Sequence, residues 1–253
     1  MSEVQDSTHG RGIADLRRAV AINRSLGPRY TPVDPLIQNE ALDEFCNSCM
    51  NGLSTVYTGE RAFNEARGAR KLHFEGVDTW GTQLANNLKG SKATASTVKE
   101  ARDLVKKIRG QRLSKEPATA ASATPADEVR RQISAAQTTF DNRLEHTRKL
   151  VALARGMGAA YQPAAEEMKL ESLDARLSRM VTLNDAVAAT AATYGNSLIA
   201  RDRLLYDAQA GAPARMDAIR TWYVSAFGAG SAERKRLNGL RVKNLSIKKL
   251  QAI

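Results

Sequence analysis

The amino-acid sequence predicts an all-α protein in which long antiparallel helices form a duplicated helical bundle with a coiled-coil-like architecture. Two long segments, 42–74 and 173–205, place mostly apolar residues at alternating steps of four and three. This heptad spacing keeps one seam on one face of a helix, and helices with such seams pack side by side as antiparallel bundles. No segment shows the β-branched alternation that is typical of strands. The third observation is an internal repeat.

The seam keeps the same register in both long segments. Asn184 occupies one seam position, where a buried asparagine sets the register of coiled coils. The seam residues of the first segment are Leu42, Cys46, Cys49, Leu53, Val56, Glu60, Phe63, Arg67, Arg70 and Phe74, and those of the second are Leu173, Leu177, Met180, Asn184, Val187, Ala191, Tyr194, Leu198, Arg201 and Leu205.

The internal repeat aligns residues 20–70 with residues 151–201 without gaps. Twelve of 51 positions are identical at an offset of 131, and only two of the twelve are alanine. A period of this length is too long for a solenoid, so we interpret the repeat as two copies of one helical unit. We assign the copies to residues 1–112 and 126–253. Residues 113–125, rich in Ala, Ser, Thr and Pro, are the expected linker.

Helix boundaries follow from capping signals. Asp34 with Pro35, and Thr124 with Pro125, each offer an N-cap and a proline at the first helical position. The Phe-Gly-Ala-Gly segment at 227–230 predicts a helix C-cap before a new N-cap at Ser231. The expected helices are 10–26, 36–75, 78–89, 95–110, 126–157, 164–209, 214–228 and 231–243.

Composition places the chain among ordinary globular proteins with a basic balance. Its 253 residues are 42% hydrophobic and 26% charged, and the net charge is +11 with a pI near 9.9. No run approaches the roughly 18 apolar residues that a membrane-spanning helix needs. The polar N-terminus lacks a secretory pattern, and the two cysteines do not require an oxidising compartment. We therefore expect a cytoplasmic protein without a transmembrane segment.

The positive charge is concentrated at the end of each copy. The long helices 36–75 and 164–210 are each net −2, whereas segment 99–115 is net +5 and segment 233–249 is net +6. Such basic segments neutralise phosphates without sequence specificity; the alternative is a solvated face or a contact with an acidic protein face. The candidate polyanion-contacting residues are Lys99, Arg102, Lys106, Lys107, Arg109, Arg112, Arg234, Lys235, Arg236, Arg241 and Lys243.

No catalytic, cofactor or metal site is indicated by a motif. Cys46 and Cys49 form a Cys-x-x-Cys, but zinc needs two further ligands and thioredoxin-type chemistry needs a βαβ context. Their seam positions predict two small core residues, with a redox role as the alternative. His9, His73 and His146 lack the Glu-x-x-His pairing of di-iron bundles. Phosphate-loop, dinucleotide-binding and serine-hydrolase patterns are also absent, so we expect a non-enzymatic protein.

Arg70 and Arg201 occupy equivalent seam positions near the ends of the two long helices. A buried arginine requires a carboxylate or carbonyl partner, and two such residues would suit an anion or ligand site inside each bundle. The interpretation that we favour is that the stems pack and the guanidinium heads reach water at the helix ends.

Four stretches resemble a family of uncharacterised bacterial proteins that contain two copies of a helical-bundle unit. The stretches are 107–112, 138–143, 196–206 and 224–231, of which the third holds an Asn-x-x-x-x-Arg run followed by Leu-Tyr. The likeness extends over about residues 10–245. It implies a duplicated helical fold and a cytoplasmic or peripheral setting in bacteria. It carries over no activity and no site residues.

These observations lead to two functional hypotheses. The first is a non-enzymatic interaction or scaffold protein that self-associates or binds another protein, because its basic segments are able to meet slightly acidic helix bodies. The alternative is a sequence-independent nucleic-acid-binding protein that uses segments 99–115 and 233–249.

Overall fold

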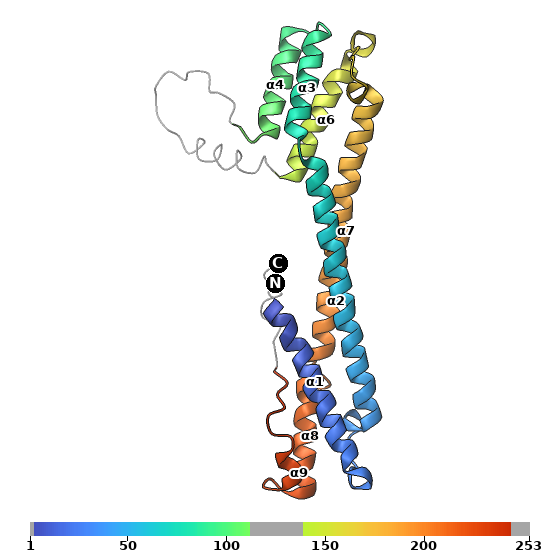
Figure 1. Cartoon of the computed structure of the whole chain (residues 1–253), viewed down its shortest axis with the longest axis vertical. Coiled ribbons are helices and arrows are strands. Elements are labelled where there is room, and N and C mark those ends of the chain that lie inside the picture. Colours follow the sequence, from blue (N-terminus) through green and yellow to red (C-terminus); the bar gives the residue numbers. More distant parts are fainter. Residues whose placement is uncertain (1–2, 112–138, 244–253) are drawn as a thin grey trace, which may run out of the picture. The chain divides into compact units, whose positions relative to one another are not determined.

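The computed structural model describes residues 3–111 and 139–243, and throughout these residues the chain is helical without strands. The predicted all-α fold is therefore confirmed. In chain order the helices are α1 (Glu3–Ser25), α2 (Asn39–Phe74), α3 (Val77–Gly90), α4 (Ala95–Ile108), α6 (Phe140–Gly156), α7 (Leu170–Tyr206), α8 (Ala212–Phe227) and α9 (Ala232–Lys235), shown in Figure 1.

The long helices begin later than the sequence predicts. Asp34 does act as an N-cap, because its side chain accepts a hydrogen bond from the Leu36 amide, but the turn that it caps is a 3₁₀ helix, η2 (Pro35–Ile37). Gln38 is then extended, and α2 starts at Asn39. A 3₁₀ turn, η4 (Glu166–Met168), also precedes the second long helix, but its N-cap residue Ala165 makes no side-chain hydrogen bond. Pro35 thus opens a short turn before α2 rather than the first turn of α2.

Two further boundaries differ from expectation. The predicted helix 231–243 ends at Lys235, and the chain turns at Gly239, whose φ of +90° favours glycine. The predicted helix 164–209 ends at Tyr206, because the Asp207 side chain accepts hydrogen bonds from the amides of Gln209 and Ala210 and so closes a turn. The linker 113–125 and the expected helical stretch 126–138 lie outside the described residues.

The chain folds into two compact units, each built from both halves of the sequence. Unit 1 comprises Met1–Ala62 and Ala191–Ile253, and unit 2 comprises Phe63–Thr190. Unit 1 therefore holds α1, the start of α2, the end of α7, α8 and α9, whereas unit 2 holds the end of α2, α3, α4, α6 and the start of α7. The compact units do not coincide with the segments 1–112 and 126–253 that the sequence repeat outlines.

The core of unit 1 joins α1, α2, α7 and α8. Leu16, Leu42, Cys49 and Ile219 are fully buried in it. Burial of each leucine-sized side chain stabilises the fold by about 1.5–3 kcal/mol. Within this unit α2 and α7 are antiparallel, since an added Cβ at Gly52 would lie 3.9 Å from Leu204 and one at Gly59 would lie 3.4 Å from the Tyr194 backbone.

The core of unit 2 is formed where α3 and α4 pack on α6. Leu84, Leu88, Ala101 and Leu150 are fully buried. The seam of the long helices contributes Phe74, Leu173 and Met180. Most apolar positions of the predicted seams are buried, whereas Phe63, Leu177, Ala191 and Tyr194 are only partly buried. Glu60 on the same seam is partly exposed and Arg67 is exposed.

The connection that precedes each long helix has the same local structure in both halves. Gly27 and Gly158 adopt left-handed φ angles of 55° and 54°, and a 3₁₀ turn starts at each, η1 (Gly27–Arg29) and η3 (Gly158–Ala160). Arg24 pairs with Asp43, and the residues 131 positions later, Arg155 and Asp174, pair likewise. Common origin of the two halves stays a prediction, and these local matches are the structural support for it.

Candidate functional site

Helix α4 of unit 2 has one apolar face and one basic face. Thr94 caps it by accepting a hydrogen bond from the Thr97 amide. The apolar residues of α4, which include Ala101, Leu104 and Ile108, are buried against α3 and α6. The solvent side carries Lys99, Arg102, Lys106 and Arg109 at steps of three, four and three, which puts them on one stripe. We call these four residues the basic face of α4.

Few carboxylates neutralise the basic face. Lys106 lies 3.3 Å from Asp103, and the nearest Asp78 oxygen is 3.9 Å from Arg109 Nε. These partly exposed pairs each contribute about 0–1 kcal/mol. Lys99 and Arg102 are exposed and form no ion pair with the described residues. The face therefore presents its positive charge to solvent.

Positive charge also surrounds a histidine on the neighbouring helix α6. His146 is half-buried, and neither ring nitrogen has a hydrogen-bond partner within the described residues. Burial lowers the pKa of His146, and the charges of Lys107 and Lys149 lower this pKa further, while Glu145 opposes them. The electropositive region thus extends from α4 to α6. No sequence pattern links Lys149 or His146 to the basic face of α4, because these two residues lie on another helix.

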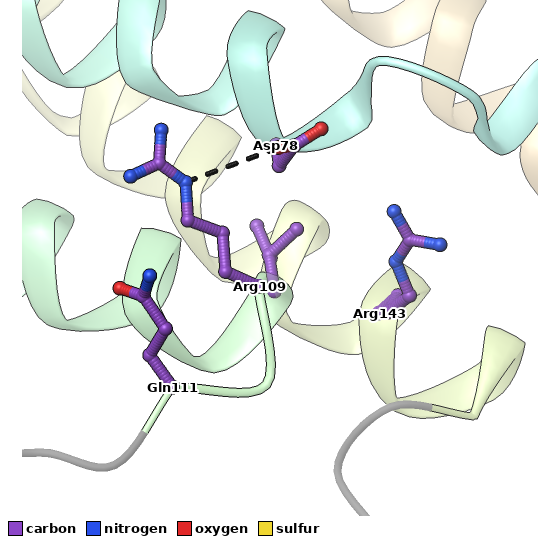
Figure 2. Close-up of a pocket in the computed structure, with 5 residues that line it drawn as sticks. Asp78, Arg109, Gln111 and Arg143 are labelled. Carbon is purple, nitrogen blue, oxygen red and sulfur yellow. Dashed lines mark ion pairs between the residues drawn. The ribbon is translucent and has the colours of Figure 1, made fainter.

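A polar pocket of about 540 Å³ lies beside the C-terminal end of α4 (Figure 2). Its lining comprises Asp78, Ile108, Arg109, Gln111 and Arg143. Arg109 Nη2 donates a hydrogen bond of 2.8 Å to Thr82 Oγ1. In the view of Figure 2 the guanidinium groups of Arg109 and Arg143 flank Asp78.

Arg143 enters this pocket from the first turns of α6. Its Nη2 donates to the Phe74 carbonyl oxygen at 3.3 Å, and its Nε is buried without a hydrogen-bond partner in the described structure. Burial lowers the pKa of this guanidinium, and the Asp78 charge offsets part of that effect. Arg143 belongs to one of the stretches that carry the family resemblance, but no sequence pattern linked it to Asp78.

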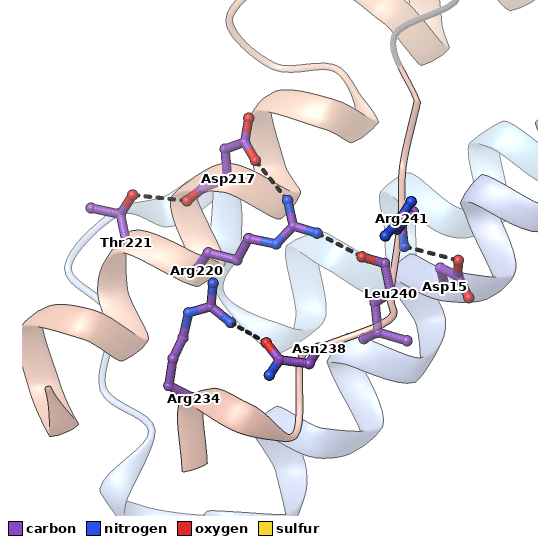
Figure 3. Close-up of polar contacts among 8 residues, drawn as sticks. All are labelled: Asp15, Asp217, Arg220, Thr221, Arg234, Asn238, Leu240 and Arg241. Carbon is purple, nitrogen blue, oxygen red and sulfur yellow. Dashed lines mark hydrogen bonds and ion pairs between the residues drawn. The ribbon is translucent and has the colours of Figure 1, made fainter. Parts of the chain in front are cut away.

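The second basic segment does not form a helical stripe in unit 1. Its described cations lie on α9, in the turn after it and in the irregular segment that follows; they are Arg234, Lys235, Arg236, Arg241 and Lys243. Figure 3 shows the hydrogen bonds that hold the segment around residues 240 and 241. Arg220 donates to the Leu240 carbonyl at 2.6 Å, and the Arg241 amide donates to Asp15 at 3.1 Å.

These hydrogen bonds fix the backbone at residues 240 and 241 and do not bring the cations of this segment together on one face. Arg234 donates to Asn238 at 3.1 Å, within the same turn. Of the candidate polyanion-contacting residues, the structure therefore collects Lys99, Arg102, Lys106 and Arg109 on one face. Lys107 lies beside them toward α6, and Arg112 lies outside the described residues.

The seam arginines have unlike surroundings. Arg201 is 2% exposed and pairs with Asp202, whose Oδ1 is 2.8 Å from Arg201 Nη2. The expectation that its head reaches water is therefore wrong, because the adjacent carboxylate allows the guanidinium to be buried. Arg70 places its guanidinium carbon 4.1 Å from the Phe140 ring centroid, which is a cation–π contact.

Cys46 and Cys49 are buried core residues, as predicted from their seam positions. Burial raises the pKa of the Cys46 thiol and raises that of Cys49 to about 12. Within the ranges that the structure describes, no group of three or more His, Cys, Asp or Glu residues is placed to hold a metal ion. No helix among them is long and apolar enough to cross a membrane.

Comparison of the chain with protein-family models, with curated proteins and with solved structures gave no significant match. The resemblance to two-copy bacterial helical proteins therefore stays a prediction.

Proposed function

We propose that this protein binds double-stranded nucleic acid without sequence specificity, through the basic face of α4. The observation that carries the proposal is a row of four cations on one exposed helix face, two of which have no carboxylate partner in the described residues. Cations held in this way release counterions from a phosphate backbone when they bind.

The dimensions of the basic face suit a duplex backbone. From Lys99 to Arg109 the helix rises about 15 Å, a distance over which a duplex advances by roughly four base pairs at 3.4 Å of helix axis each. Helix α4 contains no aromatic residue, so it offers no platform for stacking single-stranded bases. Contacts of this kind position a protein on the backbone and carry no base readout.

The contacts of the long helices reduce the negative charge that self-association could use. Asp43, Asp174 and Asp202 pair with arginines of the same chain. The exposed Glu44, Glu171 and Asp185 form no ion pair with the described residues, so they are the carboxylates that could receive the basic segment of another copy. A self-associating scaffold remains the alternative that the sequence suggests, and the same experiment distinguishes the two.

Charge reversal on the basic face tests the proposal. The double variant Lys99→Glu/Arg102→Glu replaces the two cations of the basic face that form no ion pair. The change therefore breaks no ion pair among the described residues. The matched control is Arg179→Glu/Arg203→Glu, which changes the net charge equally at exposed positions of α7. Glutamate has a helix propensity close to that of lysine and arginine, and circular dichroism checks that both variants are folded.

The readout is fluorescence anisotropy of a labelled duplex of about 20 base pairs at roughly 0.1 M salt. At about 0.1 M salt, one tenfold step below 1 M, each phosphate contact contributes about 0.9 log units to the affinity. Two lost contacts should therefore weaken binding by about 1.8 log units, roughly 60-fold. The α7 control should weaken it by only a few-fold. Equal losses in both variants would contradict the proposal that α4 is the binding face. Absence of duplex binding by the wild-type protein would contradict the function itself.

A further inference from the structure

We propose that the pocket beside the end of α4 binds the phosphorylated terminal nucleotide of a nucleic-acid strand, with Arg109 and Arg143 holding its phosphate. This inference deepens the proposed function and rests on it for the source of the nucleotide. The pocket is the one lined by Asp78, Ile108, Arg109, Gln111 and Arg143.

The two arginines have more donors than the pocket has acceptors. Each guanidinium carries five N–H groups in a planar fork. Among the described residues, Arg109 bonds Thr82 and has Asp78 3.9 Å from its Nε, while Arg143 bonds only the Phe74 carbonyl. The Nε of Arg143 also has no acceptor in the described structure, but it is buried, so the Nη groups of Arg143 are the donors that a ligand could reach. A phosphate supplies several acceptor oxygens, and arginine binds it through two parallel hydrogen bonds.

Charge in the pocket also favours an anion. Among the described lining residues, two guanidiniums accompany one carboxylate, Asp78, so this part of the lining has an excess positive charge before a ligand enters. Arg143 bears a desolvation cost that Asp78 offsets only in part. An anion held by the two arginines would stabilise both charges, and the partly buried position of Arg143 strengthens this attraction relative to the exposed face of α4.

The remaining lining indicates a nucleotide rather than a bare anion. Asp78 accepts hydrogen bonds and would repel an isolated phosphate, but it suits the hydroxyl or amino donors of a sugar or base. Gln111 both donates and accepts hydrogen bonds, and Ile108 supplies an apolar wall. The volume of about 540 Å³ lies within the range of small-molecule sites, roughly 300–1,000 Å³. A strand end fits such a pocket, whereas the continuous backbone runs along the basic face.

The test compares one duplex with and without a 5′-phosphate. Wild-type protein should bind the phosphorylated duplex about tenfold more tightly, as expected for a charge-assisted bidentate contact. Arg143→Gln should abolish this preference. The matched control is Arg176→Gln, which lies in the same unit. Like Arg143, Arg176 has a buried Nε without a hydrogen-bond partner in the described structure. Its guanidinium carbon lies 5.1 Å from the centroid of the Trp80 ring. The control variant should retain the preference.

Adenosine monophosphate, titrated by calorimetry, serves as the second probe. Duplex binding with no preference for the 5′-phosphate and no binding of the mononucleotide overturns the pocket assignment and leaves the proposed function standing. Mononucleotide binding that Arg143→Gln removes, without any duplex binding, supports the pocket and overturns the proposed function. If neither probe binds, both proposals fail.

Discussion

Tyr30 and Tyr161 lie 131 positions apart and make the same hydrogen bond. Each hydroxyl donates to the backbone carbonyl oxygen seven residues further along, at 2.6 Å to Ile37 and at 2.8 Å to Met168. Both side chains are buried, and burial raises the pKa of Tyr30 and raises that of Tyr161 to about 12. Each hydrogen bond stabilises the short connection before a long helix, between α1 and α2 for Tyr30 and between α6 and α7 for Tyr161.

Removing either hydroxyl should destabilise the fold by a similar amount. Tyr30→Phe and Tyr161→Phe each leave a carbonyl without its donor, at a cost of about 1–2 kcal/mol in the free energy of unfolding. Urea unfolding measures this loss. Tyr57, which is 48% exposed, provides the control, and Tyr57→Phe should change stability by less than about 0.5 kcal/mol. A cost at only one of the buried tyrosines would show that the two connections are not equivalent.

The buried and exposed ion pairs of unit 1 should differ sharply in their mutational cost. Asp202→Ala leaves the buried Arg201 without its carboxylate and should cost about 3 kcal/mol. Asp43→Ala breaks an exposed pair with Arg24 and should cost less than about 1 kcal/mol. Both changes place alanine in a long helix, so helix propensity is matched. Equal midpoints in urea for the two variants would refute the assignment of Arg201 to the buried interior.

Stability should fall as the pH drops from 7 toward 5. Burial lowers the pKa of both His73 and His146 below the ordinary value of about 6.5. Their unfolded forms therefore bind protons at a higher pH than their folded forms, and stability is lost as the pH falls through about 6.5 toward the folded pKa values.

The variant His146→Gln should show a smaller loss of stability over this pH range than the wild type, and His73→Gln should remove a further part. Urea midpoints measured at both pH values give the comparison. A wild-type midpoint that does not change between pH 7 and pH 5 contradicts the burial of these imidazoles.

The two thiols should be unreactive in the folded protein. Cys46 and Cys49 are 1% and 0% exposed, and their raised pKa values disfavour the thiolate at neutral pH. Because the thiolate is the reacting species, modification by a disulfide reagent should be at least about 100-fold slower in buffer than in denaturing urea. Rapid reaction of either thiol in the native protein would restore the redox interpretation of the Cys-x-x-Cys pair.

Local signals in the sequence predicted most of the helices. The seam spacing identified both long helices, and Ser231 caps α9 as expected. The sequence did not reveal the 3₁₀ turns before the long helices. A proline after an N-cap residue, as at Asp34 and Pro35, suits both helix types, and η4 has neither a capping side chain nor a proline. It also overextended the last helix, where Gly239 and the hydrogen bond from the Arg241 amide to Asp15 redirect the chain.

The candidate site was predictable only in part. The basic face of α4 follows from spacing along one helix, so the sequence revealed its members. Asp78 and Arg143 stand 65 positions apart, and they line the same pocket because α3 and α6 pack on each other and on α4. The same reasoning explains why Asp202 was not anticipated as the partner of Arg201: adjacent helical residues usually point in different directions.

The salt dependence of duplex binding tests the central claim most directly. If the basic face of α4 contacts about four phosphates, the logarithm of the wild-type affinity should fall with the logarithm of salt concentration at a slope of about −3.6, and Lys99→Glu/Arg102→Glu should reduce the slope to about −1.8. A shallow wild-type slope, or a slope that the double variant leaves unchanged, would contradict nucleic-acid binding through α4.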